Sequence, residues 1–256
     1  MYDPASPLLR NGTGASGLPQ PDAKARFAED RLLDAVVWCE VLPGDTITES
    51  DVMERFGLSR AAARAALTRL GYDGWAQPLA RMGWQVLPVT GALIGEVLTA
   101  RRLVEPEALG AARLSDTQIA EVQRIGQILS AIQDQSDRGA IIAFRQFVDE
   151  IDSLLVASIN EFTARHLRNL WHHSARMTRY LEDASAGRIF RRDDVFALVR
   201  AVTDCDAQGV RSARHTLIDA QEAFFLRQVL KSKAALGPGS GLRKHAGQAA
   251  NNRRST

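Results

Sequence analysis

The sequence has few cysteines, no long apolar run and no basic leader. Cys39 and Cys205 are its two cysteines, too few for a disulfide framework, so a reduced, cytoplasmic protein is the default expectation. No stretch approaches the roughly 18 uninterrupted apolar residues of a membrane-spanning helix. Residues 1–21, MYDPASPLLRNGTGASGLPQP, lack the basic start and apolar centre of a secretory signal.

The sequence also lacks a large excess of positive or negative charge. The chain has 32 Lys and Arg against 30 Asp and Glu, a formal net charge of +2, so any nucleic-acid-binding surface must be local. The common catalytic motifs G-x-S-x-G, H-E-x-x-H, G-x-x-x-x-G-K-[ST] and a structured G-x-G-x-x-G are missing, which argues against an enzyme. A hydrophobic content of 45% over 256 residues is enough for one large or two smaller globular domains.

Proline is absent between Glu107 and Gly237, although eight of the nine prolines lie in the first 106 residues. A proline-free stretch permits uninterrupted helices, and apolar residues recur there at helical spacing. We therefore expect an all-α bundle over 90–233. One expected helix begins at a Ser115–Gln118 capping box, and the next carries the apolar stripe Phe144–Ser158. Three more helices are expected over 161–182, 193–205 and 207–232.

The two ends of the chain have a different composition. Residues 1–22 are rich in Pro, Gly and Ser, and we expect a loose arm. Residues 234–256 carry five Arg, Lys or His and nothing to bury. This pattern predicts a flexible basic tail that adds at most a nonspecific attraction to phosphates.

Residues 23–89 predict a separate small domain. A first helix over 23–41 is followed by the turn Leu42–Asp45, a short helix after Thr48 that stops at Gly57, and a helix that begins at the N-cap Ser59 and runs to Leu70. The buried face of the first helix is expected to hold Phe27, Leu32, Leu33, Val36 and Val37. Helix, glycine turn, helix is the helix-turn-helix pattern. Two short strands around Arg81-Met82-Gly83 would form a wing. The expected fold class is mainly α: a winged helix-turn-helix of three helices and a small β-wing, then the helical bundle.

The charge distribution within 23–89 gives mixed support for DNA binding. Eight basic and nine acidic side chains leave this domain at −1, but the helix 59–70 has three arginines and no acid. Arg60 and Arg64 lie four apart, on one face of the end that enters a major groove. A guanidinium there can read guanine or clamp a phosphate. The alternative interpretation is a solvated arginine face on an ordinary helix.

The segment LPGDTITESDVMERFGLSRAAARAALTRLGYDGWAQPLARMGWQV resembles the winged helix-turn-helix of GntR-family transcriptional regulators. The shared features are Leu42-Pro43-Gly44, Glu49, Gly57-Leu58-Ser59-Arg60, Arg64, Ala66-Leu67, Asp73-Gly74 and the wing glycine Gly83. The resemblance implies that Arg60 and Arg64 contact operator DNA and that the Gly83 wing lies along a minor groove. The candidate DNA-binding residues are Ser59, Arg60, Arg64, Arg69, Arg81 and Gly83. Ala61-Ala62 and Ser50 depart from the family pattern, which usually has threonine-proline and arginine there.

The next residues resemble the helical effector domain of the fatty-acid-regulator-like (FCD) subfamily. The motif Arg101-Arg102-Leu103-Val104-Glu105-Pro106 resembles its R-x-x-L-E-P opening, and Ala157-Ser158-Ile159-Asn160 resembles one of its helix ends. The resemblance implies a bundle of six or seven helices around a small-molecule pocket, and a homodimer.

Most members of that subfamily hold a divalent metal with an aspartate and three histidines. Alignment on Ala157–Asn160 and on Cys205-Asp206 places those four positions at Phe147, Ile151, Val195 and Leu217. All four are apolar, so we expect no metal and no other cofactor. The region of the bundle that holds the metal in the family is then either a pocket for a larger apolar or acyl ligand or a filled core.

The anchor for a carboxylate effector would be an arginine, because its fork matches two oxygens. Arg101 is the first candidate and Arg145 the second; the ligand-binding set is Arg101, Arg145, Phe147, Ile151, Val195 and Leu217. A different metal site could be built from histidines and either Asp149 or Asp152. Solvated or hydrogen-bonded histidines are the favoured interpretation of His166, His172, His173 and His215.

Together these patterns predict a cytoplasmic homodimer that binds double-stranded operator DNA and a small organic acid or acyl effector, without enzymatic activity. Repression relieved by the effector is favoured over activation. The alternative is a ligand-binding or scaffolding helical protein whose degenerate winged-helix domain no longer reads DNA. The net charge of −1 and the Ala61-Ala62 and Ser50 departures keep that alternative open.

Overall fold

The computed structural model describes residues 20–132, 137–182 and 188–231. The expected basic tail over 234–256 lies outside the described residues, as does most of the expected arm over 1–22. The first helix, α1 (Gln20–Val37), begins three residues earlier than expected, so the last residues assigned to the arm are helical. Within the described part of the chain, no helix is long and apolar enough to cross a membrane.

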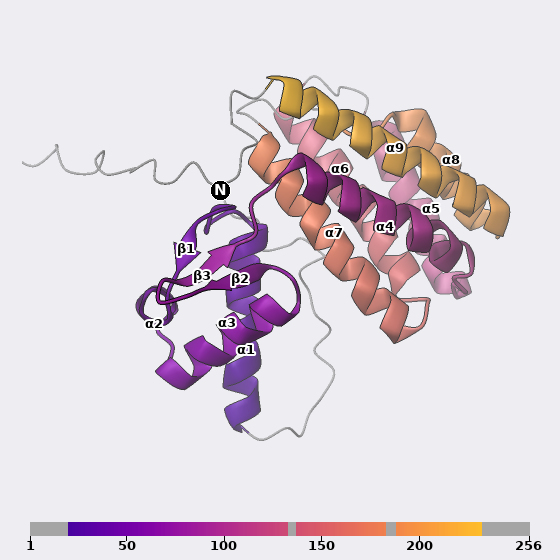
Figure 1. Cartoon of the computed structure of the whole chain (residues 1–256). Coiled ribbons are helices and arrows are strands. Elements are labelled where there is room, and N and C mark those ends of the chain that lie inside the picture. Colours follow the sequence, from indigo (N-terminus) through magenta and orange to yellow (C-terminus); the bar gives the residue numbers. More distant parts are fainter. Residues whose placement is uncertain (1–19, 133–136, 183–187, 232–256) are drawn as a thin grey trace, which may run out of the picture.

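The expected winged helix-turn-helix is confirmed. After α1 come β1 (Thr46–Ile47), α2 (Glu49–Phe56), α3 (Arg60–Tyr72), β2 (Ala76–Leu79) and β3 (Gly83–Val86). Figure 1 shows α1 crossing behind α3, with the small sheet at one end of both helices. Their shared core includes Leu32, Val36, Val52, Leu67 and Trp75, each at most 1% exposed. One expectation for α1 is wrong: Phe27 is 60% exposed and does not belong to this core.

Local capping fixes the two helices of the helix-turn-helix. The Thr48 backbone N–H donates to Asp51 Oδ2 at 2.8 Å, and the Asp51 N–H donates to Thr48 Oγ1 at 3.2 Å, which is a complete capping box at the start of α2. Gly57 ends α2 with a left-handed φ of 65°, a conformation that costs glycine little. Ser59 Oγ accepts the Ala62 N–H at 3.3 Å and caps α3. The turn between the two helices is therefore fixed by residues that lie close together in the sequence.

The wing has three strands rather than the two expected from the sequence. The strand order is β1-β3-β2, and both pairs are antiparallel. The extra strand, β1, is only two residues long, too short for an alternating pattern to reveal. Gly83 has a φ of 101°, and a Cβ on it would lie 2.6 Å from the Ile47 carbonyl oxygen. Glycine at this position is what allows β1 to approach β3.

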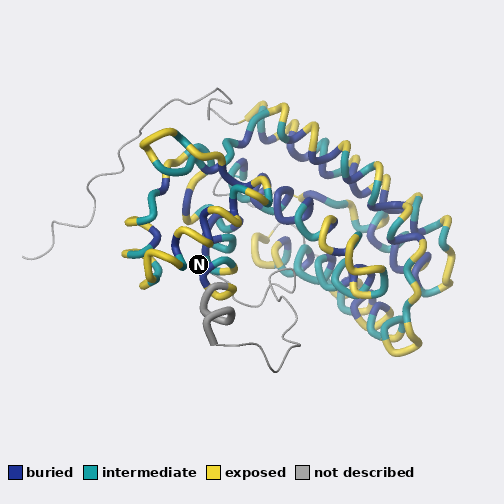
Figure 2. The backbone as a smooth tube through the Cα atoms, turned by 60° about the horizontal axis from the view of Figure 1, so that its bottom comes forward, coloured by how far each residue is buried: buried dark blue, intermediate teal, exposed yellow. Residues whose placement is uncertain are grey.

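The second domain is the expected all-α bundle. It comprises α4 (Gly91–Gly110), α5 (Asp116–Ala131), α6 (Arg138–Val156), α7 (Glu161–Leu181), α8 (Arg192–Thr203) and α9 (Ala207–Lys231). The Ser115–Gln118 capping box that starts α5 is present. In Figure 1, α9 runs along α4 on one side and α8 on the other. Figure 2 shows the buried residues along the inward faces of the helices and the exposed residues on the outer faces.

The two domains have separate hydrophobic cores that meet at α7. Ala175 of α7 packs against the core of the first domain, while Leu167, Leu170 and Trp171 belong to the core of the bundle. Arg176 is fully buried, and its Nη1 donates to the Leu87 carbonyl at 2.9 Å. Helix α7 therefore belongs to the bundle and also forms the surface against which the winged domain packs.

Candidate DNA-binding surface and ligand positions

The exposed first turns of α3 carry the principal DNA-binding candidates. Ser59 is engaged as N-cap, so its hydroxyl already accepts a backbone hydrogen bond. Arg60 is exposed, and no ion pair or hydrogen bond is recorded for its side chain within the described residues. Arg64 lies one turn later with 69% of its side chain exposed, and its Nε donates to Glu49 Oε1 at 2.7 Å. Glu49 thereby holds Arg64 across the two helices of the helix-turn-helix.

The other sequence-derived candidates are spread over two further places. Arg81 is exposed in the β2–β3 turn, with a left-handed φ of 62°. Gly83 follows it and has the structural role already given by its closeness to Ile47. Arg69 lies at the far end of α3, where its Nε donates to Asp73 Oδ2 at 2.7 Å. Arg60, Arg64 and Arg81 are thus exposed, but Arg64 is paired with Glu49 and Arg69 with Asp73. DNA contact by these residues stays a prediction.

In the helical domain, the four positions aligned with the family's metal ligands are packed. Ile151, Val195 and Leu217 are at most 2% exposed and belong to one hydrophobic cluster, against which the half-buried Phe147 packs. Their surroundings are therefore hydrocarbon. Among the described residues, no group of three or more His, Cys, Asp or Glu side chains is placed to hold a metal ion.

Both candidate carboxylate anchors already bind a carboxylate of the protein. Arg101 is buried; its Nε donates to Glu105 Oε2 at 2.7 Å and its Nη2 to Glu105 Oε1 at 3.2 Å. Arg145 donates from Nη1 and Nη2 to the two oxygens of Glu182, at 3.0 and 2.7 Å. An effector carboxylate at either arginine would have to displace or share the internal partner.

A buried polar network around Glu105 was not predicted from the sequence. Besides Arg101, Glu105 accepts the indole N–H of Trp171 at 2.9 Å and lies 3.6 Å from Arg214 Nη1. Arg214 also donates to Asp152, and Arg101 donates to Gln221 and Ser174. The network joins α4, α6, α7 and α9. The four-residue spacing of Arg101 and Glu105 was the one local signal for it.

The charges of this network are mutually stabilised. Burial alone would raise the pKa of Glu105, but the guanidinium groups of Arg101 and Arg214 and the Trp171 hydrogen bond hold it below its usual value. Glu105 is therefore ionised inside the bundle. Burial raises the pKa of Asp152, while its contact with Arg214 opposes that effect.

His172 and His173 are buried at the domain junction rather than solvated. The His173 ring stacks on Trp75 with 3.7 Å between centroids, and His172 lies at 6.4 Å from the same ring. Burial first, and then the neighbouring Arg176 and His172, lower the pKa of His173 to about 3. Both histidines thus serve the contact between the domains.

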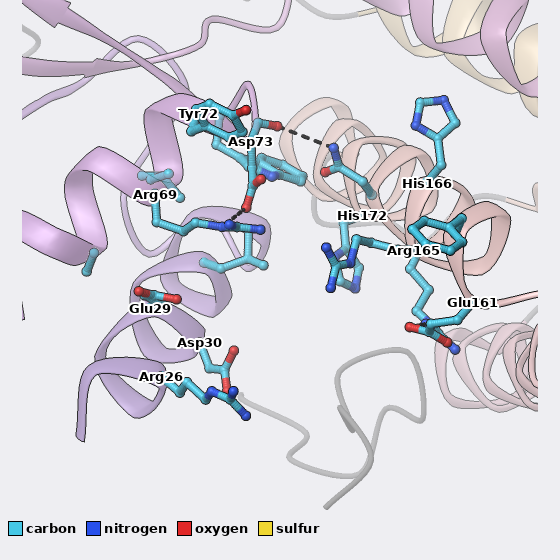
Figure 3. Close-up of a pocket in the computed structure, with 17 residues that line it drawn as sticks. Arg26, Glu29, Asp30, Arg69, Tyr72, Asp73, Glu161, Arg165, His166 and His172 are labelled. Atoms are coloured by element: carbon cyan, nitrogen blue, oxygen red, sulfur yellow. Dashed lines mark hydrogen bonds and ion pairs between the residues drawn. The ribbon is translucent and has the colours of Figure 1, made fainter. Parts of the chain in front are cut away.

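Next to this junction lies a cleft of about 780 Å³. Figure 3 shows its two walls: Arg26, Glu29, Asp30, Arg69 and Asp73 come from the winged domain, and Glu161, Arg165, His166 and His172 come from α7. A hydrogen bond from Asn169 Nδ2 to the Asp73 carbonyl, 3.3 Å long, crosses between the walls. Sequence reasoning did not find this cleft, because it is formed by residues from opposite parts of the chain.

A winged helix-turn-helix with an exposed arginine face, followed by a helical bundle, is the architecture of DNA-binding transcriptional regulators. Residues 24–86 match the family model for bacterial regulatory proteins of the gntR family. The chain therefore carries a GntR-family DNA-binding domain, and the resemblance read from its motifs is confirmed at this level.

Two solved structures share the fold over both domains. "E. coli McbR/YncC" is 20% identical with a TM-score of 0.66, over 80% of this chain and 98% of that one. A putative GntR transcriptional regulator from Rhodococcus sp. RHA1 is 18% identical with a TM-score of 0.60, over the same shares. No curated protein matches the chain in sequence.

Proposed function

We propose that this protein is a sequence-specific repressor of the FCD type, which acts as a homodimer and responds to a small-molecule effector. The observation that carries the DNA-reading part is the pair Arg60 and Arg64 on the exposed first turns of α3. In a helix-turn-helix, the N-terminal end of the second helix is the part that contacts base edges in a major groove. The β2–β3 turn adds a further exposed cation, Arg81.

Regulation is proposed to work by linkage. Two recognition helices in a dimer must sit about 34–36 Å apart to enter successive major grooves on one side of the duplex. A ligand that binds one arrangement of the domains more tightly shifts the population toward it and changes the operator affinity by the same coupling. The junction of Trp75 with α7 supports this proposal, because it joins the winged domain to the bundle.

The proposed effector is an organic acid or acyl compound, and the helical domain is proposed to bind it without a metal. The apolar side chains at Phe147, Ile151, Val195 and Leu217 support an apolar rather than a metal-chelating environment. Arg101 and Arg145 remain the proposed anchors. Each of them binds a glutamate carboxylate in the bidentate manner, so an effector carboxylate would take the place of Glu105 or Glu182.

The test is fluorescence anisotropy with the full-length protein and DNA from upstream of its own gene, scrambled competitor and a salt series. Arg60→Ala should cost about 1–3 kcal/mol of specific binding if Arg60 reads a base, and Arg64→Ala should also weaken it. Arg124→Ala is the control, because Arg124 is an exposed arginine on α5 paired with Glu121.

Wild-type binding that ignores sequence and disappears at modest salt would contradict the regulator proposal. It would favour a ligand-binding or scaffolding protein instead. If Arg60→Ala weakened binding equally on all DNA sequences, Arg60 would be a phosphate contact.

A further inference from the structure

We propose that the cleft between the winged domain and α7 is a binding site for a small organic anion with a flat aromatic body. The cleft volume of about 780 Å³ falls within the range of about 300–1,000 Å³ that is usual for small-molecule pockets. The cleft is separate from the site proposed in the bundle, which consists of apolar side chains and arginines that pair with glutamates.

The α7 wall of the cleft carries the guanidinium of Arg165, with the imidazole of His166 next to it in the sequence. Among the acidic side chains that line the cleft, Asp73 pairs with Arg69 at 2.7 Å and Glu161 pairs with Arg168 at 3.1 Å. Arg165 and His166 are exposed, and no hydrogen bond or ion pair is recorded for either side chain within the described residues. This wall therefore offers donors to an anion.

The opposite wall sets the orientation of such a ligand. Glu29 and Asp30 lie on α1, with Arg26 beside them, and burial raises the pKa of Glu29. In Figure 3 these side chains and Arg165 lie on opposite sides of the opening. An anionic group is repelled by the α1 carboxylates, so it should bind at Arg165 and His166.

The apolar part of the ligand would meet aromatic side chains from both domains. Tyr72 at the end of α3 is 87% exposed, and Phe162 at the start of α7 is 92% exposed. Large exposed aromatic side chains on both walls of one cleft are an apolar surface without a cover in the described chain. Flat rings stack on such side chains in offset or edge-to-face arrangements. An aromatic carboxylate would combine contact with this surface and an ion pair with Arg165.

A ligand in this cleft would touch the two parts whose relative placement controls DNA binding. Asp73 caps the recognition helix α3, and its carbonyl holds Asn169 of α7 across the cleft. This regulatory consequence rests on the proposed function, whereas the binding site itself does not. Occupancy should shift the placement of α3 relative to the bundle and so change operator affinity.

The experiment is calorimetric titration of the full-length protein with 1-naphthoate, and with the neutral 1-naphthalenemethanol as the uncharged comparison. We expect one saturable naphthoate site per chain. Arg165→Gln and Phe162→Ser should each weaken it at least tenfold, and naphthalenemethanol should bind at least tenfold more weakly. Arg124→Gln, on the exposed face of α5, should stay within twofold of wild type. Both cleft substitutions are at the surface, so unchanged melting temperatures will verify folding.

Saturable binding that ignores both cleft substitutions would overturn the proposed site, as would no saturation at millimolar naphthoate. The same proteins are then tested for operator binding with and without naphthoate. Wild type should change its operator affinity at least threefold and Arg165→Gln should not. If the wild-type protein bound no DNA specifically, the proposed function would be contradicted, but the naphthoate titration would still test the cleft site. Naphthoate bound in the cleft with operator affinity unchanged would overturn the regulatory consequence alone.

Discussion

Trp75 and His173 stack with nearly parallel rings, 3.7 Å between centroids and 6° between planes. Trp75 lies three residues beyond the end of α3, and His173 lies in the middle of α7. Arg176 covers the same indole at 5.4 Å from the ring centroid, in addition to its hydrogen bond to the Leu87 carbonyl. The winged domain is thus attached to the bundle through a buried aromatic contact and a buried cation, rather than through a loose linker alone.

Trp75→Ala should therefore destabilise the winged domain and detach it from α7. Trp75 is 1% exposed, and removal of a buried tryptophan side chain costs about 3–5 kcal/mol. Denaturant unfolding followed by circular dichroism measures the loss. Tyr72→Ala is the control, because Tyr72 is exposed and such substitutions usually change stability by less than about 0.5 kcal/mol. Equal effects of the two substitutions would contradict the role assigned to Trp75.

The parts of the fold that the sequence predicted are those specified by neighbouring residues. Thr48 with Asp51, Gly57 and Ser59 define the helix-turn-helix within a dozen positions, and Ser115 with Gln118 starts α5 in the same way. The Glu105 network and the interdomain cleft depend on residues that meet only in the folded chain. Gln221, for example, lies 120 positions from Arg101. Phe27 was misassigned because an apolar side chain on an amphipathic helix need not face the core.

Gly83→Ala should destabilise the protein more than Gly74→Ala or Gly91→Ala. An alanine there combines a left-handed backbone, worth about 1–3 kcal/mol, with a Cβ 2.6 Å from the Ile47 carbonyl. Gly74→Ala has a comparable φ of 80° but open space around its Cβ, and Gly91→Ala has neither problem. The expected order of thermal stability is Gly91→Ala, Gly74→Ala, Gly83→Ala, from highest to lowest. Equal melting temperatures for the last two would mean that β1 moves aside freely.

Glu105→Gln should be among the most destabilising conservative changes in the bundle. It removes the charge that compensates Arg101 and contacts Arg214, both of which are buried. Loss of one partner of a buried ion pair costs about 3–5 kcal/mol. The matched control is Glu107→Gln, two residues on in the same helix, whose pair with Arg211 is at the surface and should be worth about 0–1 kcal/mol. Urea unfolding of both variants decides the point; similar midpoints would show that the network contributes little.

Glu49→Gln should strengthen nonspecific DNA binding by releasing Arg64. The Glu49 carboxylate accepts from Arg64 Nε at 2.7 Å and from Nη2 at 3.3 Å, and this hydrogen bond is the main reason that the pKa of Glu49 is lowered. A released guanidinium adds about one phosphate contact, so the slope of log K against log salt should steepen by about 0.9. Anisotropy titrations on scrambled duplex over a salt series measure it. Arg64→Ala combined with Glu49→Gln should abolish the gain; a gain that survives would place its source elsewhere.

Asp149 should make the protein less stable as the pH rises from about 4 to about 7. Burial first, and then the neighbouring Asp152, raise the pKa of Asp149 to about 7, although Arg179 and Arg145 partly oppose this and Glu150 adds to it. The native state therefore keeps a proton that the unfolded chain releases near pH 4. Stability is highest below that value, falls through the interval and levels off above pH 7.

Asp149→Asn should flatten this part of the profile of melting temperature against pH, because the amide does not titrate. The variant should gain stability relative to wild type at pH 8 and lose the advantage at pH 4. Burial also raises the pKa of Asp34 to about 6, so Asp34→Asn serves as the comparison and should remove a separate, lower part of the slope. A wild-type slope that is unchanged in Asp149→Asn but abolished in Asp34→Asn would assign the pH dependence to the winged domain instead of the bundle.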